Sequence, residues 1–307
     1  MAKIAPSSLT ALRTARPPQA ALSWVASTFG PGSRATAVRY LPGGQAQAVH
    51  AVEVLDGELR PHEVVLRRWV RPDWELTDPD FTVGREALAL RLVAEAGVPA
   101  PRLQATDSRP DHCDVPALLM SLLPGSPYAT SRDTSAFTAQ LARAAHDVHT
   151  LGTGADLPPY RPYNDLRDPR PPVHAARPEV WDQAFNVVAG TPPSSASCLI
   201  HRDYHPGNTL WQGDQLTGIV DWSYASYGPV SIDLAHMRWN LVLSHGRTTA
   251  GSFLDDYLDL TGGGFEHHPY WDLRTVVDLM PEPTGSPFSP PDVLQLEGYL
   301  DRLLAQI

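Results

Sequence analysis

The first part of the chain alternates short apolar runs with turn residues. Three runs are rich in β-branched and apolar side chains: 36–42, 46–55 and 63–70. Gly43-Gly44 separates the first run from the second, and Asp56-Gly57 separates the second from the third. Runs of this kind joined by glycine-containing turns are typical of successive antiparallel strands. The pattern therefore predicts a small antiparallel sheet near the N-terminus.

A helix and one more strand complete the predicted N-terminal half. From Phe81 to Ala96 the apolar positions recur with helical period, and a glycine and a proline follow where a helix should end. Residues 115–123 form a further apolar run, which Pro124-Gly125 closes. We expect a hinge there, and we therefore predict two domains, 1–121 and 122–307.

The second half of the chain is predicted to be mainly helical. Residues 134–151 place their apolar side chains on one helical face. A proline-rich connection from Leu157 to Pro178 leads to a second helix at 179–189. Beyond Asp233 helices and loops alternate, and an amphipathic helix from Pro291 to Ile307 closes the chain. With strands first and helices after them, the expected fold class is α+β.

Composition excludes several functional classes. The 307 residues are 42% hydrophobic and 19% charged, as in a folded globular chain with room for two domains. No stretch approaches 18 uninterrupted apolar residues and no secretory signal is recognisable, so we expect a cytoplasmic protein without a membrane span. A net charge of −10 argues against nucleic-acid binding, which uses a basic surface. Cys113 and Cys198 are expected to be buried free thiols.

The charged residues are unevenly distributed. Residues 221–307 contain 4 basic and 12 acidic side chains, whereas residues 1–120 contain 13 of each kind. Lys3 is the only lysine in the sequence, and apart from the histidines every other basic residue is arginine. A phosphate-binding loop of the form G-x-x-x-x-G-K and a Schiff-base enzyme with an internal lysine are therefore excluded.

One segment contains the residues that phosphoryl transfer needs. Residues 201–208 read His-Arg-Asp-Tyr-His-Pro-Gly-Asn, and Asp221 follows thirteen residues later at the end of an apolar run. Asp203 can accept a hydroxyl proton, Asn208 can face the same cleft, and an aspartate at a strand end can hold Mg²⁺. This order and spacing predict the active-site loop of a phosphotransferase.

With 218–222 (Gly-Ile-Val-Asp-Trp) and 228–235 (Gly-Pro-Val-Ser-Ile-Asp-Leu-Ala), this loop resembles the aminoglycoside phosphotransferase family. That family is a bacterial branch of the protein-kinase-like fold, with choline, homoserine and macrolide kinases among its relatives. The resemblance runs roughly from Tyr40 to Trp239. It implies a two-lobed fold in which a small antiparallel-sheet lobe, 1–121, binds the nucleotide. A larger, mostly helical lobe, 122–307, then performs catalysis and binds the acceptor.

The resemblance assigns roles around the active-site loop. Asp203 would be the catalytic base, and Asn208 and Asp221 would hold the Mg²⁺ ions that bridge the phosphates of ATP or GTP. His201 would brace the loop through hydrogen bonds, and Asp233 would tie the loop in place. His205 is also expected to be structural.

The resemblance also assigns nucleotide contacts in the first lobe. Gly43 and Gly44 match the glycine turn over the phosphates, although a plain hairpin turn accounts for them equally well. Arg67 occupies the position of the third-strand lysine that grips the phosphates, and Glu86 is its expected ion-pair partner. The alternative is an exposed strand arginine and a solvated helix glutamate. Met120, Ser121 and Leu122 lie in the segment that links the lobes, where backbone groups would bind a purine. A buried strand explains these residues as well, and both interpretations can hold together.

The acidic residues after Asp221 indicate a cationic acceptor, because a cleft of one charge sign concentrates ligands of the other. Asp255, Asp256 and Asp259 are candidates for contacting ammonium groups, and a solvated acidic helix face explains them equally well. The first hypothesis is therefore a Mg²⁺-dependent kinase that phosphorylates a small cationic molecule such as an aminoglycoside-type antibiotic, which would confer resistance.

Three alternatives stay open. A metabolic kinase acting on an amino alcohol or a sugar would use the same catalytic residues with a different pocket. A nucleotide-binding module without turnover is suggested by Arg67 in the lysine position. A zinc hydrolase would use His201, Asp203 and His205 as ligands, but that hypothesis leaves Asn208 unexplained.

Overall fold

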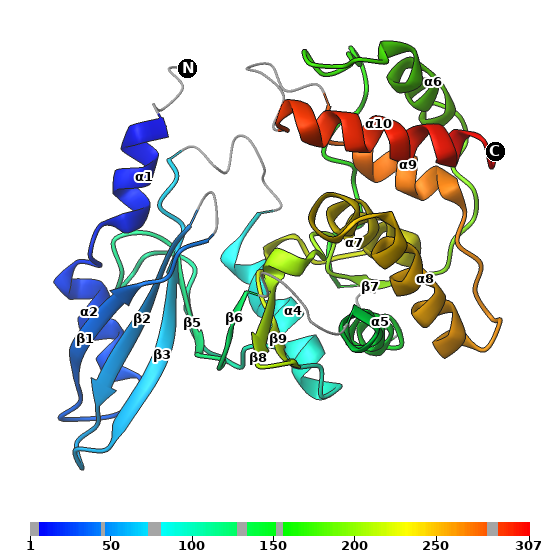
Figure 1. Cartoon of the computed structure of the whole chain (residues 1–307). Helices are drawn as coiled ribbons and strands as arrows, with labels where there is room; N and C mark the ends of the chain where they lie inside the picture. The colour runs from blue at the N-terminus through cyan, green and yellow to red at the C-terminus, as the bar shows by residue number, and fades with distance from the viewer. Residues whose placement is uncertain (1–5, 44–46, 73–80, 128–133, 152–155, 281–287) are drawn as a thin grey trace. The chain divides into compact units, whose positions relative to one another are not determined.

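The computed structural model describes the chain except for residues 1–5, 44–46, 73–80, 128–133, 152–155 and 281–287 (Figure 1). The chain forms two compact units. The first, here called the N-terminal unit, contains the residues up to Pro124 together with Gly218–Tyr224. The second, the C-terminal unit, contains Gly125–Thr217 and Ala225–Ile307. The assignment of a nucleotide-binding role to 1–121 and a catalytic role to 122–307 stays a prediction.

A five-stranded antiparallel sheet with the order β1-β2-β3-β5-β4 is the core of the N-terminal unit (Figure 1). Its strands are β1 (Arg34–Tyr40), β2 (Ala48–Leu55), β3 (Pro61–Arg68), β4 (Leu103–Asp107) and β5 (Ala117–Ser121). The three expected N-terminal strands and the strand expected within 115–123 are confirmed, with ends shifted by a few residues. The sequence pattern did not predict β4, because this edge strand is largely exposed and carries little apolar signal.

Two helices precede the sheet, α1 (Pro6–Thr14) and α2 (Gln19–Ser27). Both are only nine residues long, and the pattern analysis did not predict them. Leu22 and Val25 of α2 are buried in one hydrophobic cluster with Val52 of β2 and Leu66 of β3. Packing on the sheet therefore stabilises α2, since isolated helices of this length are marginal in water.

The expected helix at 81–96 is α4 (Val83–Glu95), and it receives the returning segment Gly218–Tyr224. The Thr82 side chain accepts a hydrogen bond from Arg85 N at 3.1 Å and so caps the helix. The returning segment is held where Arg85 Nη2 donates to Tyr224 O at 2.9 Å. The fully buried indole of Trp222, in the short 3₁₀ turn η2 (Trp222–Tyr224), completes this packing.

The C-terminal unit is mainly helical, as expected. Its helices are α5 (Thr134–His149), α6 (Pro178–Val188), α7 (Val230–His245), α8 (Arg247–Thr261), α9 (Pro269–Val277) and α10 (Pro290–Leu304). Helix α7 packs against α8, α9 and α10 (Figure 1), and most of its residues are buried, as in a central helix. None of the helices in the described ranges is both long and apolar enough to cross a membrane.

Short strands frame the segment 201–208 in the C-terminal unit. Strand β7 (Ser197–Ile200) leads into it and pairs with β10 (Ser226–Pro229). The turn η1 (Pro206–Asn208) ends it, and β8 (Thr209–Gln212) follows between β6 (Ser126–Pro127) and β9 (Gln215–Ile219). Strand β9 begins in the C-terminal unit, and its last two residues belong to the N-terminal unit.

Gly125 is the glycine whose replacement should disturb the C-terminal unit most. It has φ +105, and an added Cβ would lie 2.5 Å from the carbonyl oxygen of Trp211. We expect Gly125→Ala to lower the free energy of unfolding by about 2–3 kcal/mol, because backbone strain and the clash add. Gly97→Ala is the matched control: Gly97 has φ +71 with nothing within 4 Å, so about 1 kcal/mol is expected. Equal losses for the two variants in denaturant unfolding would contradict the prediction.

A fully buried aspartate joins three helices of the C-terminal unit. Asp272 of α9 accepts hydrogen bonds from Tyr299 of α10 at 2.7 Å and from Arg238 of α7, and it pairs with His267 Nε2 at 2.7 Å. Burial raises its pKa, but Arg238 and His267 outweigh burial and lower the pKa of Asp272 to about 2.

This aspartate should give the protein an acid-sensitive core. Its pKa is lower in the folded than in the unfolded chain, so its stabilisation is present above about pH 4 and is lost as the pH falls toward 2. A shift of this size corresponds to about 2 kcal/mol. We expect Asp272→Asn to destabilise the protein at pH 7 and to flatten the dependence of unfolding free energy on pH between 4 and 2. If urea unfolding gave the variant the same dependence of unfolding free energy on pH between 4 and 2 as the wild-type chain, the prediction would be wrong.

Candidate functional site

Asp233 holds the backbone at the start of the segment 201–208. Its carboxylate, 1% exposed on the first turn of α7, accepts from His201 N at 2.7 Å and from Arg202 N at 2.6 Å. The structure thus brings Asp233 to the loop as predicted, whereas His201 meets it through its backbone amide. The hydrogen bonds fix Arg202 at φ +69, a left-handed conformation that a non-glycine residue adopts only when its surroundings enforce it.

Two further side chains support Asp233 from neighbouring helices. His149 of α5 places Nε2 3.1 Å from Asp233 Oδ2 and Nδ1 2.9 Å from the hydroxyl of Tyr257 on α8. All three side chains are buried. The orientation of the loop therefore depends on α5, α7 and α8 together.

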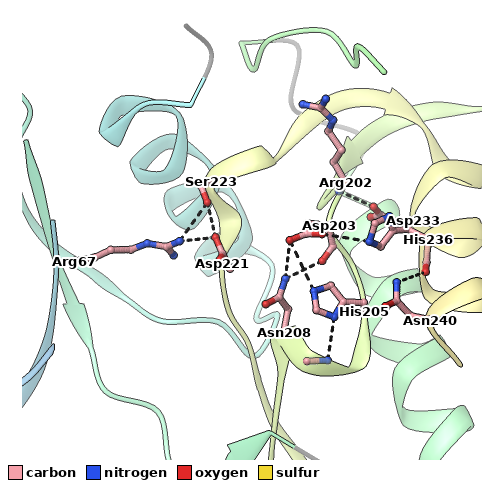
Figure 2. Close-up of polar contacts among 11 residues, drawn as sticks. Arg67, Arg202, Asp203, His205, Asn208, Asp221, Ser223, Asp233, His236 and Asn240 are labelled. Carbon is pink, nitrogen blue, oxygen red and sulfur yellow. Dashed lines mark hydrogen bonds and ion pairs between the residues drawn. The ribbon is translucent and has the colours of Figure 1, made fainter. Parts of the chain in front are cut away.

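Asp203 is held at both carboxylate oxygens. His236 Nε2 lies 3.2 Å from Oδ1, and Asn208 Nδ2 donates to Oδ2 at 3.1 Å (Figure 2). His205 Nε2 is 3.8 Å from Oδ2. Burial raises the pKa of Asp203, but the hydrogen bond from His236 and the nearby imidazoles bring it below its usual range. The lowered pKa keeps this carboxylate ionised at neutral pH, and the side chain is 27% exposed and so stays accessible.

His236 is a site residue that the sequence reasoning missed. It lies one helical turn after Asp233 on α7, so both side chains point toward the same loop (Figure 2). The spacing of three residues between Asp233 and His236 was the sequence signal that could have predicted this contact.

Asn208 is oriented by its own loop. Its amide nitrogen donates to Asp203 O at 2.9 Å and to Asp203 Oδ2, which leaves Oδ1 of Asn208 turned away from these acceptors. A neutral amide oxygen held in this way is suited to ligate a hard cation such as Mg²⁺.

In the N-terminal unit, Arg67 joins two carboxylates. Its Nη1 donates to Glu86 Oε1 at 2.8 Å. Its Nη2 donates to Asp221 Oδ1 at 2.5 Å and to Ser223 Oγ at 3.3 Å (Figure 2). Arg67 is 3% exposed and Glu86 is 1% exposed. The predicted partnership of Arg67 with Glu86 is thus present, and the alternative of an exposed arginine with a solvated glutamate is wrong. The sequence did not predict that Asp221 shares the same guanidinium.

Burial and charge act in opposite directions in this cluster. Burial raises the pKa of Glu86 to about 7, although Arg67 opposes the shift. Asp221 has φ +66 and a side chain 22% exposed, and its hydrogen bonds with Arg67 and Ser223 both fall on Oδ1. The positive charge of Arg67 therefore offsets the repulsion between the neighbouring carboxylates of Glu86 and Asp221.

The remaining nucleotide candidates differ in their surroundings. Gly43 has φ +131, which suits a tight turn, while Gly44 lies outside the described residues. Met120 is buried inside β5, paired with Val65 on one side and Leu103 on the other, so the sheet uses this part of the backbone. Leu122 follows the end of the strand and is half-buried.

The three acidic acceptor candidates lie on α8. Asp255 and Asp259 are exposed, and Asp256 is half-buried. Asp256 and Asp259 line a groove that also contains Arg143, so a cation of the protein already lies there. Six other acidic residues of 221–307 have hydrogen-bond partners within the C-terminal unit: Asp233, Asp272, Asp278, Asp292, Glu297 and Asp301. Much of the acidic excess therefore serves the fold.

The metal-hydrolase alternative finds no ligand cluster. In the part of the chain that the structure describes, no group of three or more His, Cys, Asp or Glu side chains could hold a metal ion. The ligand set His201, Asp203 and His205 is thus not assembled. Both cysteines are buried and free, as expected.

Comparison with known proteins assigns the sequence to one family. The family model described as "Phosphotransferase enzyme family" matches residues 30–271. A curated N-acetylmuramate/N-acetylglucosamine kinase of Pseudomonas putida is 28% identical over 82 residues, which are 27% of this chain and 24% of that protein. The match thus spans about a quarter of the length of that relative.

Solved structures share the fold. A thermostable mutant of aminoglycoside phosphotransferase APH(4)-Ia, in a ternary complex with AMP-PNP and hygromycin B, has a TM-score of 0.61 at 15% identity, covering 94% of this chain and 98% of that one. Macrolide 2'-phosphotransferase MphH from Brachybacterium faecium has a TM-score of 0.57 at 20% identity, covering 94% of this chain and 93% of that one. The predicted kinase-like α+β fold class is confirmed.

Proposed function

Because the chain belongs to the aminoglycoside phosphotransferase family of small-molecule kinases, we propose that it transfers the γ-phosphoryl group of ATP or GTP to a hydroxyl of a small molecule. The observation that carries the proposal is the fixed, ionised carboxylate of Asp203, held by His236 and Asn208 on a loop that Asp233 ties down. Phosphoryl transfer needs positioning and charge neutralisation more than covalent help from the protein.

In the proposed reaction, Asp203 accepts the proton of the acceptor hydroxyl. The bond between the γ-phosphorus and the β–γ bridging oxygen breaks, a new bond forms from phosphorus to the acceptor oxygen, and the nucleoside diphosphate leaves. A base with a low pKa takes the proton late, as suits a loose transition state in which the hydroxyl is only weakly activated. Before the proton is transferred, the main role of Asp203 is to orient the acceptor hydroxyl.

Asn208 and Asp221 are proposed to bind Mg²⁺ through oxygen atoms. Their donor set fits this ion, because the amide oxygen of Asn208 is turned away from its own loop contacts and Asp221 uses Oδ1 for Arg67 and Ser223. Bound Mg²⁺ would neutralise charge on the nucleotide phosphates.

Arg67 is proposed to replace the usual lysine. Its guanidinium is permanently charged and presents several donors, so it could hold Glu86 and Asp221 and also donate to a phosphate. The alternative of a nucleotide-binding module without turnover rested on this substitution. The ionised Asp203 and the oriented Asn208 support a catalytic role instead.

The acceptor of an aminoglycoside-type kinase would be cationic, and this expectation rested on the acidic residues after Asp221. Partners within the fold account for half of those residues. A metabolic kinase for a sugar or an amino alcohol is therefore the second candidate, and it would use the same catalytic residues.

The test is a coupled assay of nucleotide consumption with Mg²⁺, offering ATP and GTP with aminoglycosides, macrolides, sugars and amino alcohols. Turnover with one acceptor class that yields a phosphate monoester would support the proposal. Failure to bind either nucleotide in titration calorimetry would exclude it.

A further inference from the structure

His236 of α7 is a buried histidine whose ring faces the carboxylate of Asp203 (Figure 2). Its Nε2 lies 3.2 Å from Asp203 Oδ1. An ionised carboxylate can only accept, so Nε2 carries a hydrogen and donates it to Oδ1. Asn208 Nδ2 donates to the other oxygen, Oδ2, at 3.1 Å. Each oxygen of the carboxylate therefore has a donor from the protein, and together the two donors fix the orientation of the carboxylate.

The second imidazole near Asp203 is held by its own turn. His205 Nδ1 accepts from Gly207 N at 3.1 Å, and His205 Nε2 is 3.8 Å from Asp203 Oδ2, which is too far for a hydrogen bond. The rings of His205 and His236 lie with their centroids 5.9 Å apart. Of these two histidines, His236 is therefore the one that forms a hydrogen bond with Asp203.

The surroundings of His236 leave its ring little freedom to turn away from Asp203. The indole of Trp239, one helical turn further along α7, meets the imidazole edge-on with the centroids 5.1 Å apart. His236 also lines a cavity of about 10 Å³, whose wall includes Tyr163 and the Arg202 guanidinium stacked 4.1 Å from the centroid of that tyrosine ring. Such a cavity holds no more than about one water molecule. Packing therefore keeps the imidazole directed at the carboxylate.

Helix α7 holds the loop at two points. Asp233 accepts hydrogen bonds from the backbone amides of His201 and Arg202 and so places the chain just before Asp203. His236, three residues after Asp233, holds the side chain of Asp203 itself. Residues three apart on a helix lie on the same face, so one rigid element sets both the backbone and the carboxylate. Loss of the second contact would leave the loop in place and free only the carboxylate.

We infer that His236 is a positioning residue for phosphoryl transfer, which by donating from Nε2 to Oδ1 keeps the carboxylate of Asp203 oriented toward the acceptor hydroxyl. The inference rests on the proposed phosphotransferase function. His236 acts through Asp203 rather than on the substrates. Its loss should therefore lower kcat and leave the KM values for nucleotide and acceptor nearly unchanged, because the contact matters only when Asp203 orients and deprotonates the hydroxyl.

Two amide variants of the full chain separate positioning from packing. The amide nitrogen of His236→Gln can reach the place of Nε2 and donate to Oδ1, whereas the shorter side chain of His236→Asn cannot. We expect His236→Asn to lower kcat about 10–100-fold, as is typical when an outer partner of a functional side chain is lost, with both KM values changed less than about threefold. His236→Gln should recover most of that loss. Equal losses in the two variants, or no loss in His236→Asn, would overturn the inference.

A matched control and a double-mutant cycle complete the kinetic test. His245→Asn removes another imidazole from α7, one that contacts Ser244 and Phe137, and it should retain full activity. In a chain that already carries Asp203→Ala, His236→Asn should change kcat less than about threefold, because no carboxylate remains to be positioned. Losses that multiply in the double variant would contradict a role through Asp203. Thermal unfolding checks that each variant is folded.

Nitrogen-15 NMR of the histidine-labelled chain separates this inference from the proposed function, because it needs neither nucleotide nor acceptor. Nε2 of His236 should carry the hydrogen, and its signal should shift in Asp203→Ala. If this signature is present while the wild-type chain consumes no nucleotide with any acceptor, the contact with Asp203 is supported and only the proposed function fails. A hydrogen on Nδ1 alone, with signals unchanged by Asp203→Ala, would overturn the inference. The tautomer of the wild-type chain also decides the matter if His236→Asn does not fold.

Discussion

Asp203→Asn is expected to lower kcat for phosphoryl transfer by about 10²–10⁴-fold, the usual contribution of a positioned general base. The amide preserves the shape of the side chain and can still accept a hydrogen bond from His236 Nε2, but it cannot take a proton. Nucleotide KM should change less than threefold, because Asp203 is proposed to act on the acceptor rather than on the nucleotide.

The measurement is a coupled assay with the acceptor identified for the wild-type chain, accompanied by thermal unfolding. Asp182→Asn, at an exposed position of α6 in the same unit, is the matched control and should retain full activity. If Asp203→Asn kept more than a tenth of the wild-type kcat while folded, Asp203 would not be the base.

Arg67→Leu is expected to lower the free energy of unfolding by about 3–5 kcal/mol, because it leaves Glu86 buried without its counter-charge and removes the partner of Asp221. Nucleotide affinity should fall as well, since the proposed phosphate contact is lost. Arg67→Lys keeps one positive charge but loses the forked geometry that reaches both carboxylates, so an intermediate loss is expected.

Arg68→Leu provides a control at the next residue of the same strand. Arg68 is equally buried, but its ion-pair partner among the described residues is Asp114, whose side chain is 39% exposed and can be rehydrated. Its loss should therefore cost less than that of Arg67. Adding Glu86→Leu to Arg67→Leu should recover part of the stability, because it removes one unpaired charge. Denaturant unfolding in which Arg67→Leu stays within 1 kcal/mol of the wild-type chain would contradict this account.

The sequence predicted the main strands and helices because their signals are local, and the segment proposed as the active-site loop has a local signal too. The motif 201–208 has fixed spacing, and α4 and α5 have long apolar faces. Short elements such as α2 and β4 were missed because contacts with the sheet, rather than their own residue pattern, stabilise them.

Contacts between distant residues were the harder part of the site. The sharing of Arg67 between Glu86 and Asp221 joins positions 154 residues apart in the chain, and no local pattern indicates it. His236 had a signal in its spacing from Asp233, but a histidine on an apolar helix is more often a packing residue. The acidic excess alone does not identify an acceptor site, because charge counts do not show which carboxylates already have partners within the fold.

The return of Gly218–Tyr224 to the N-terminal unit has a consequence for how the protein can be divided. The chain passes between the two units three times, after Pro124, Thr217 and Tyr224, so the N-terminal unit is not one continuous piece of sequence. A fragment ending at Pro124 would lack Asp221 and the buried indole of Trp222. To express this unit alone, Gly218–Tyr224 would have to be joined to it through a new linker.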